Sequence, residues 1–454
     1  MALSRPGDDP VSERTITAGR LQQISDDVLA ALAWTRVGWL AYWAAVGLCF
    51  YIWAIAAAVW AYQIHEGFTI TGLKHPVMWG FYITAFVFWI GIAHSGTLVS
   101  AILFLFRAHW RTPIARMAET MTIVAVMTAA LFPVIHLGRA WRLYWLIPYP
   151  NQRGLWINFS SPLVWDAAAI ATYFIVSLLF WFMDLVPDFA LLRDRSHGWA
   201  HTIYRYLAFG WSGTAGQWRY FRSAYTLMAG LITALVVSVH SIVSWDFAMA
   251  IVPGWHSSIF APYFVAGAIL SGLSMLLTLV IPGRELLGIR AYVTARHLEN
   301  IAKLIVAVSL IVTYAYVTEL FFAWLGDDGY VRSAFANRGV GHYAPLFWLS
   351  FVCNSVVPLT FFSAAVRRSA WKLFVASILI NLGMWSERLL IIVSSLSREF
   401  NAYSWGTYMP RWPEWTILLG SGAWFVFWFL LIIGHVPPVP IADMKEAVLE
   451  GHDA

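Results

Sequence analysis

The sequence contains little charge. Only 12% of its 454 residues are Asp, Glu, Lys or Arg, against about 25% in an ordinary soluble domain, whereas 60% are hydrophobic. This balance excludes an ordinary soluble fold and indicates a polytopic membrane protein. The formal net charge of +5 includes no basic run, so we expect the lipid bilayer, and no nucleic acid, as a partner.

Cysteine is nearly absent. Cys49 and Cys353 stand alone in different apolar runs, which excludes a cysteine-ligated iron–sulfur cluster and argues against a disulfide. The first twenty residues are polar and lack the apolar core of a cleavable signal peptide, so we expect none. Any redox centre would therefore be organic or would lie in another subunit.

Long apolar runs make up most of the chain. A helix of about 20 residues crosses the roughly 30 Å of bilayer hydrocarbon. Windows of this kind fall at about 37–62, 76–106, 120–138, 162–183, 223–252, 257–281, 304–325, 343–366, 373–397 and 415–436. We therefore predict an all-α integral membrane protein with ten transmembrane helices and no soluble domain.

Basic residues predict how the spans are oriented. With the N-terminus in the cytoplasm, 20 of the 29 Lys and Arg residues fall in inner segments and 8 in outer ones, and Arg388 lies within a span. Because short basic connections stay in the cytoplasm, we predict a multi-pass protein with both termini cytoplasmic. The connection 184–222 is the longest inner one.

Five of the 53 charged residues fall inside the apolar runs, and this orientation puts all of them in the outer half of the membrane. They are Asp166, Asp246, Glu319, Glu387 and Arg388. An ionisable group at such a depth costs roughly 2.5 to 3.5 kcal/mol on insertion scales. Each of the five therefore needs either a partner or a function.

A candidate site gathers at the outer ends of the third, fourth and fifth spans. His136 and Arg139 close the third span on one helix face. Asp166 lies in the first turns of the fourth span. His240 and Asp246 approach the same surface on the fifth, about 120° apart around their helix, so one pocket need not hold both.

Quinol oxidation suits this set of side chains. Two protons must leave the ring hydroxyls, and a neutral His beside a carboxylate accepts protons near neutral pH. Aromatic residues surround the site in the sequence: Trp141, Tyr144, Trp145, Trp156 and Trp165. A bis-His haem is disfavoured, because His94 is central in its span whereas His136 and His240 are peripheral.

Structural explanations stay open at each position. A His or Asp at a helix end can simply reach the interface, and Glu387 with Arg388 can be an ion pair inside a bundle. His94 lies among small residues and suits either helix packing or a proton relay. The arginines after the third span suit the interface or a partner better than catalysis: Arg139, Arg142 and Arg153.

Several stretches, taken in order, resemble the membrane subunits of the NrfD-like polysulfide reductase and nitrite reductase family. The closest resemblance is to the ten-helix quinol-interacting subunit of bacterial alternative complex III. The strings include "GIAHSGTLVSAILFLFR", "FPVIHLGRAWRLYWLIPYP", "SPLVWDAAAIATYFIVSLLFWFMDLVPDFALLRDR", "WSGTAGQWRYFRSAY" and "NLGMWSERLLIIVSSLSREF". The resemblance implies two four-helix bundles, spans two to five and six to nine, flanked by spans one and ten. The implied parts are a cytoplasmic segment 1–36, a first span and quinol-binding bundle 37–252, a second bundle 253–397, and a last span and tail 398–454.

The resemblance also implies the site and its partners. His136 and Asp166 would be catalytic and would bind the quinol together with Arg139 and Asp246. We expect the quinol to be menaquinol. No haem or iron–sulfur cluster is expected in this chain. Electrons would pass to an iron–sulfur, molybdopterin-oxidoreductase-like subunit on the periplasmic face. Multihaem cytochrome c subunits and a second NrfD-like membrane subunit are further expected partners.

Two classes of function therefore remain. The chain is either a quinol-oxidising subunit of a respiratory or photosynthetic electron-transfer complex, with or without proton translocation, or a quinone-free subunit that conducts protons or is structural. The second class would give more weight to residues of a proton path: His94, His240, Glu319, Glu387 and Arg388.

Overall fold

The computed structural model describes residues 10–32, 36–147 and 159–449, which are helical apart from turns and links. Ten helical segments of this part are long and apolar enough to cross a membrane, which confirms the predicted all-α fold with ten spans. Their main helices are α2 (Arg36–Glu66), α3 (Phe81–Thr97), α5 (Thr112–His136), α6 (Pro162–Arg195), α8 (Ala215–Ala248), α9 (Phe260–Leu286), α10 (Ala295–Leu325), α12 (Ala344–Phe351), α15 (Ala370–Leu396) and α16 (Trp412–Ile433). A π-helical turn continues α3 over Leu98–Ile102, and another continues α12 over Val352–Val356.

Several helices extend beyond the predicted apolar windows, among them those of the third, fourth, fifth and seventh spans. We expected the third span to begin near residue 120 and the fourth to end near 183. Instead, α5 begins at Thr112 and α6 runs on to Arg195, so the expected connection 184–222 consists mainly of helix ends and the short helix α7 (Gly198–Leu207). Charged residues ended the apolar windows of the third and fourth spans, and in the folded protein Arg116 of α5 pairs with Asp184 and Asp188 of α6.

Four helices pack in a ring around one core. Helix α3 packs against α5 and α8, and α6 closes the ring by packing against both of them. We call α3, α5, α6 and α8 the first ring and α9, α10, α12 and α15 the second ring. The rings meet where α3 lies along α9, while α2 and α16 pack together beside α5.

Close packing inside the rings depends on small residues. A side chain at Gly96 would collide with the backbone of Ala118 on α5, and one at Gly272 would collide with Ser95 on α3. Glycine therefore lets neighbouring helices approach at both places, as in many membrane bundles. The spans built on α3, α5, α9 and α15 are accordingly the most buried of the ten.

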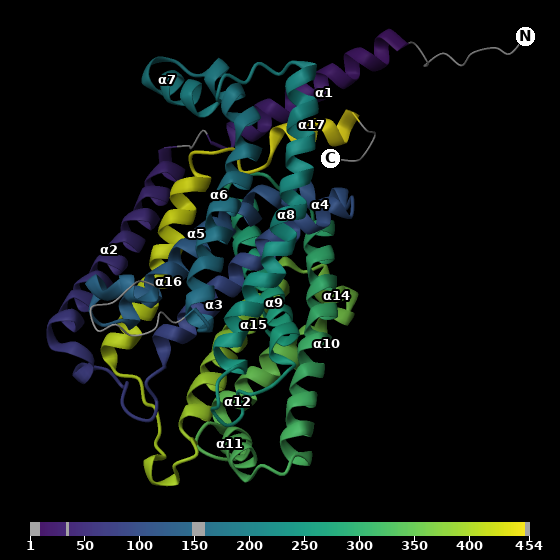
Figure 1. Ribbon diagram of the computed structural model, residues 1–454. Helices are drawn as coiled ribbons and strands as arrows, with labels where there is room; N and C mark the ends of the chain where they lie inside the picture. Colours follow the sequence, from purple (N-terminus) through teal and green to yellow (C-terminus); the bar gives the residue numbers. More distant parts are fainter. Residues whose placement is uncertain (1–9, 33–35, 148–158, 450–454) are drawn as a thin grey trace, which may run out of the picture.

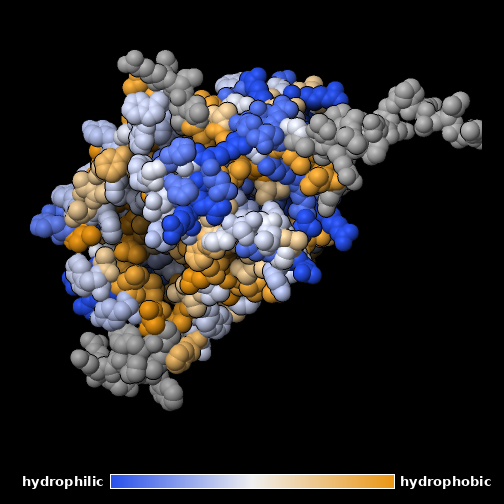
Figure 2. Space-filling view, turned by 90° about the horizontal axis from the view of Figure 1, so that it is seen from above, coloured by the Kyte–Doolittle hydropathy of each residue, from blue (hydrophilic) through white to orange (hydrophobic). Residues whose placement is uncertain are grey.

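The two ends of the helix bundle differ. Short helices α1 (Pro10–Ala30), α7 and α17 (Ile441–Leu449) lie across one end, whereas α11 (Gly329–Gly339) lies at the other (Figure 1). We call these ends the α1/α17 face and the α11 face. Seen from above, the α1/α17 face shows many hydrophilic side chains over its middle and its upper and right-hand parts, and hydrophobic ones mainly below and to the left of the middle (Figure 2). This pattern is typical of a bundle end that leaves the bilayer.

Candidate functional site

A cavity of about 600 Å³ lies in the first ring near the α11 face. Three ionisable side chains line it: His136, Asp166 and Asp246. The rest of its wall is almost entirely apolar and includes Trp79, Phe86, Phe174, Phe247 and Trp424. An apolar cavity with a few convergent polar groups is the usual form of a site for a small organic ligand.

Helix ends bring the three ionisable groups together. His136 is the last residue of α5, Asp166 lies in the second turn of α6, and Asp246 lies two residues before the end of α8. Adjacent antiparallel helices that end at the same depth place such residues side by side. The structure thus brings together three of the residues that the sequence analysis placed at the outer ends of these spans.

Each of the three groups has a buried polar atom without a protein partner. Within the described residues, His136 Nδ1, Asp166 Oδ1 and Asp246 Oδ1 are shielded from solvent and make no hydrogen bond. Buried polar atoms are nearly always hydrogen-bonded in native proteins. A ligand with two hydroxyl groups, or water, would satisfy them, so the side chains fit a quinol ring.

Aromatic side chains fix the shape of the polar end. The Trp79 ring stands edge-on to His136, at 6.4 Å between centroids, and edge-on to Phe247, at 5.9 Å. Phe68 approaches His136 from another side, at 6.3 Å between centroids. The imidazole is thus held by packing rather than by hydrogen bonds, while the cavity keeps space for a planar ring.

Two expected members of the site lie elsewhere. Arg139 is exposed and does not line the cavity. His240 is fully buried against His94, with 4.7 Å between ring centroids. The expectation that both histidines share one depth with the carboxylates was therefore wrong, because the six residues from His240 to Asp246 span about 9 Å of helix.

His94 lies in the core of the first ring. Its Nδ1 is 2.5 Å from the carbonyl oxygen of Ile90, and its ring stacks on Tyr173 at 4.9 Å between centroids. The Tyr173 hydroxyl lies 2.7 Å from that of Thr97 and donates to the carbonyl of Ala93 at 3.0 Å. Both helix packing and proton transfer remain compatible with this arrangement.

The aromatic residues chosen from the sequence do not line the cavity where they fall within the described part of the chain. Trp141, Tyr144 and Trp145 are exposed on the short helix η4 (Ala140–Leu146), and Trp165 bonds to the carbonyl of Phe159 at 2.7 Å. Trp156, like Arg153, lies outside the described residues. The true walls include Trp79 and Trp424, which come from distant parts of the chain. No local sequence signal marks them.

The second ring holds the expected polar cluster. Glu387 and Arg388 approach to 3.4 Å, and the Tyr316 hydroxyl donates to Glu387. The amide of Asn354 also donates to Glu387, at 3.2 Å. Glu319 lines both a small inner cavity beside this cluster and a larger one of about 920 Å³ near the α11 face. The smaller cavity of the first ring is the better candidate site, because His136, Asp166 and Asp246 each present an unpartnered buried polar atom there within otherwise apolar walls.

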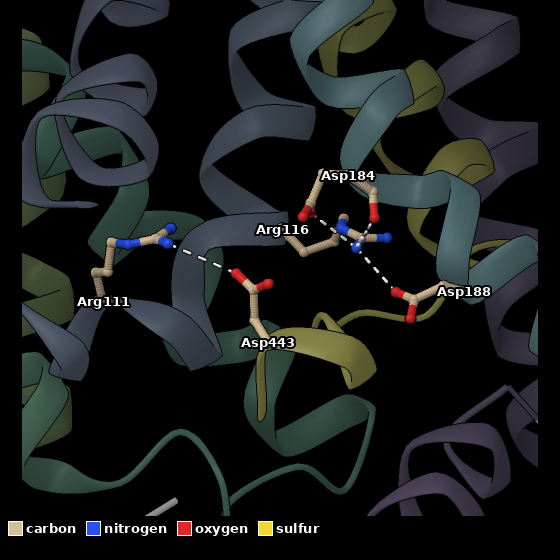
Figure 3. A network of polar contacts seen from close by, with 5 residues as sticks. All are labelled: Arg111, Arg116, Asp184, Asp188 and Asp443. Carbon is tan, nitrogen blue, oxygen red and sulfur yellow. Dashed lines mark hydrogen bonds and ion pairs between the residues drawn. The ribbon is translucent and has the colours of Figure 1, made fainter. Parts of the chain in front are cut away.

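A second charged network lies at the opposite end of the first ring, and the sequence patterns considered above did not indicate it. The Arg116 guanidinium lies between Asp184 and Asp188, with Nη2 at 2.9 and 2.8 Å from their Oδ2 atoms (Figure 3). Asp443 of α17 reaches Arg111 at 3.5 Å. Burial, aided by the nearby Asp184, raises the pKa of Asp443 to about 7. The i, i+4 spacing of Asp184 and Asp188 was the available signal.

Comparisons with known proteins agree with one another. The sequence model of the family described as "Polysulphide reductase, NrfD" matches residues 69–398. A putative dimethyl sulfoxide reductase membrane subunit of Halobacterium salinarum is 26% identical over 375 residues, covering 82% of this chain and 80% of that protein. The "Hdr-like menaquinol oxidoreductase integral membrane subunit" of Archaeoglobus fulgidus is 24% identical over 226 residues, covering 49% and 46% respectively. A selenate reductase subunit of Mesobacillus selenatarsenatis is 24% identical over 230 residues, covering 48% and 51%.

Proposed function

The chain belongs to the polysulphide reductase NrfD family, and we propose that it is the quinol-oxidising membrane subunit of an electron-transfer complex. The observation that carries the proposal is the convergence of three unpartnered, buried polar atoms at one end of an apolar cavity. A quinol has two ring hydroxyls that match these atoms and an apolar body that matches the walls. The name of the relative from Archaeoglobus fulgidus supports menaquinol as the substrate.

The cavity residues would take the protons. His136 Nδ1 accepts the proton of one ring hydroxyl, and a carboxylate of Asp166 or Asp246 accepts the other. Two electrons leave the ring at the same time for an acceptor outside the chain, and the product is the quinone. Because His136 and Asp166 lie at helix ends, both protons have a short route to water at the α11 face.

The electron acceptor would lie in a partner subunit on the α11 face. We propose an iron–sulfur, molybdopterin-oxidoreductase-like subunit there, since the chain's relatives include subunits of named reductases. An assembly of the alternative complex III type, with multihaem cytochromes and a second NrfD-like subunit, is the finer form of this proposal. In that form the α11 face is periplasmic and both termini are cytoplasmic, as the basic residues predict.

The test removes each proton acceptor from the assembled complex. Quinol-dependent reduction of the complex's own cofactors should fall about 10² to 10⁴-fold in His136→Leu and in Asp166→Asn, the usual range for a positioned acid or base. His197→Leu and Asp194→Asn change the same residue types at exposed positions on the opposite, α1/α17 face and should keep the wild-type rate. Wild-type rates in both cavity variants would refute the assignment.

A quinone-free, proton-conducting role is the second candidate. The observation in its favour is the set of buried ionisable groups outside the cavity: His94, His240, Glu319, Glu387 and Arg388. Extraction of the purified complex distinguishes the two roles. Quinone that is retained by the wild type and lost in His136→Leu supports the first, whereas absence of quinone from every preparation supports the second.

A further inference from the structure

The cavity of the first ring extends well beyond its polar end. On α5 its wall continues to Met127, and on α6 it continues to Phe174. At a rise of 1.5 Å per residue, these side chains lie about 12 to 14 Å along the helices from His136 and Asp166. Every lining residue at this deeper end is apolar or aromatic. The cavity therefore has one end for polar groups and one for a hydrocarbon chain.

The deeper end reaches the outer surface of the bundle. Ala130 on α5 and Ala171 on α6 both line the cavity, and both are exposed. They belong to membrane-spanning segments, so the surface that they share faces lipid. Helices α6 and α16 each pack against α5 but pack much less against each other. An opening therefore lies between α6 and α16, and α5 forms its floor.

Trp424 of α16 forms the far edge of this opening. Its ring packs against Trp53 of α2 at 5.0 Å between centroids and against Trp428 at 5.5 Å. Neighbouring rings thus support it from behind, away from the cavity. Its buried Nε1 has no hydrogen-bond partner among the described residues. On the opposite edge, Ala171 of α6 contributes only a methyl group to the lining, and a larger side chain at this position would narrow the passage.

We propose that the opening between α6 and α16 admits a quinol with a long isoprenoid tail directly from the bilayer, and that the tail remains in it while the ring reacts. This inference rests on the proposed function and adds a route and a tail-binding part to the site. Ala130 and Ala171 are small because the tail passes over them, and Trp424 is the fixed wall against which it lies.

The experiment compares two quinols that differ only in the tail. The assembled complex would be assayed in proteoliposomes with menaquinol-7 and in detergent with menadiol, which has no isoprenoid tail. Ala130→Trp and Ala171→Trp should lower the rate with menaquinol-7 at least tenfold and the rate with menadiol less than threefold. Ala168→Trp is the matched control, since Ala168 is equally exposed on α6 but does not line the cavity. It should leave both rates unchanged.

The outcomes separate the two proposals. If the wild type oxidises neither quinol, the proposed function fails and the passage fails with it. If the wild type oxidises both quinols but the lining variants treat them alike, the passage is refuted while the function stands.

A labelling experiment covers variants that do not assemble. A menaquinone analogue with a diazirine in its third isoprene unit should label peptides that contain Met127 or Trp424 in the wild-type complex. Labelling confined to other helices would overturn the proposal.

Discussion

Arg116 offers the sharpest test of what holds the first ring together. Its side chain is completely buried. The hydrogen bonds from Arg116 to the carboxylates of Asp184 and Asp188 both come from one nitrogen, Nη2. Replacing Arg116 with Met would preserve much of the volume but leave two buried carboxylates without their cation. Breaking a buried pair in this way typically costs about 3 to 5 kcal/mol. We expect Arg116→Met to lower the thermal stability of the detergent-solubilised complex strongly or to prevent assembly.

The control is an ion pair at the same end of the molecule that is open to solvent. Arg195 lies 2.5 Å from Asp26, but the side chains are 35% and 53% exposed. Exposed pairs contribute about 0 to 1 kcal/mol, so Arg195→Met should change the unfolding temperature little. Adding Asp184→Asn and Asp188→Asn to Arg116→Met removes the uncompensated charge and should restore part of the loss. Equal stability of the Arg116 and Arg195 variants would refute the argument that burial makes this network costly to break.

Three further predictions concern other regions. Arg388→Leu should reduce assembly, because it leaves Glu387 buried without its cation; normal assembly and full turnover would exclude both a structural and a relay role. Burial places the pKa of Asp443 at about 7, above that of an unfolded carboxyl, so docking of α17 is most stable at low pH and weakens as pH rises toward 7. After correction for the intrinsic exchange rate at each pH, the amides of α17 should be less protected at pH 8 than at pH 5, and Asp443→Asn should remove this change in protection. A cysteine at His197 should react with reagents on the cytoplasmic side only; labelling from the periplasm would reverse the orientation.

The position of the site could be predicted because helix ends are visible in a sequence. His136 and Asp166 flank the link between two consecutive spans, and Asp246 ends the next one, so antiparallel packing alone brings them to one depth. The same reasoning failed for His240, which we treated as near the helix end although it lies about two turns deeper. The depth of a side chain in the membrane depends on how many residues separate it from the helix end. A difference of six residues is therefore enough to place His240 in the core of the ring and Asp246 in the cavity.

The walls of the cavity could not be predicted, since they depend on packing between distant segments. Trp79 precedes α3 and Trp424 belongs to α16, yet both line the same space as Asp166. In a chain with 27 Trp residues, composition cannot separate those that face a ligand from those at the membrane interface. Only the arrangement of α16 beside α5 identifies Trp424 as part of the site.

The network around Arg116 shows why charge alone misplaces a helix boundary. An apolar-window criterion treats each charged residue as a cost, and by that measure α5 should begin after Glu119. In the folded protein the cost of burying Arg116 is offset by two carboxylates one turn apart on α6. The pairing stabilises the charged part of both helices beyond their apolar windows. Such pairing cannot be seen in either segment alone. Two features together indicate it: opposite charges just beyond the ends of two neighbouring spans, and an i, i+4 spacing of the charges on one of these spans. This signal could be sought in other membrane proteins.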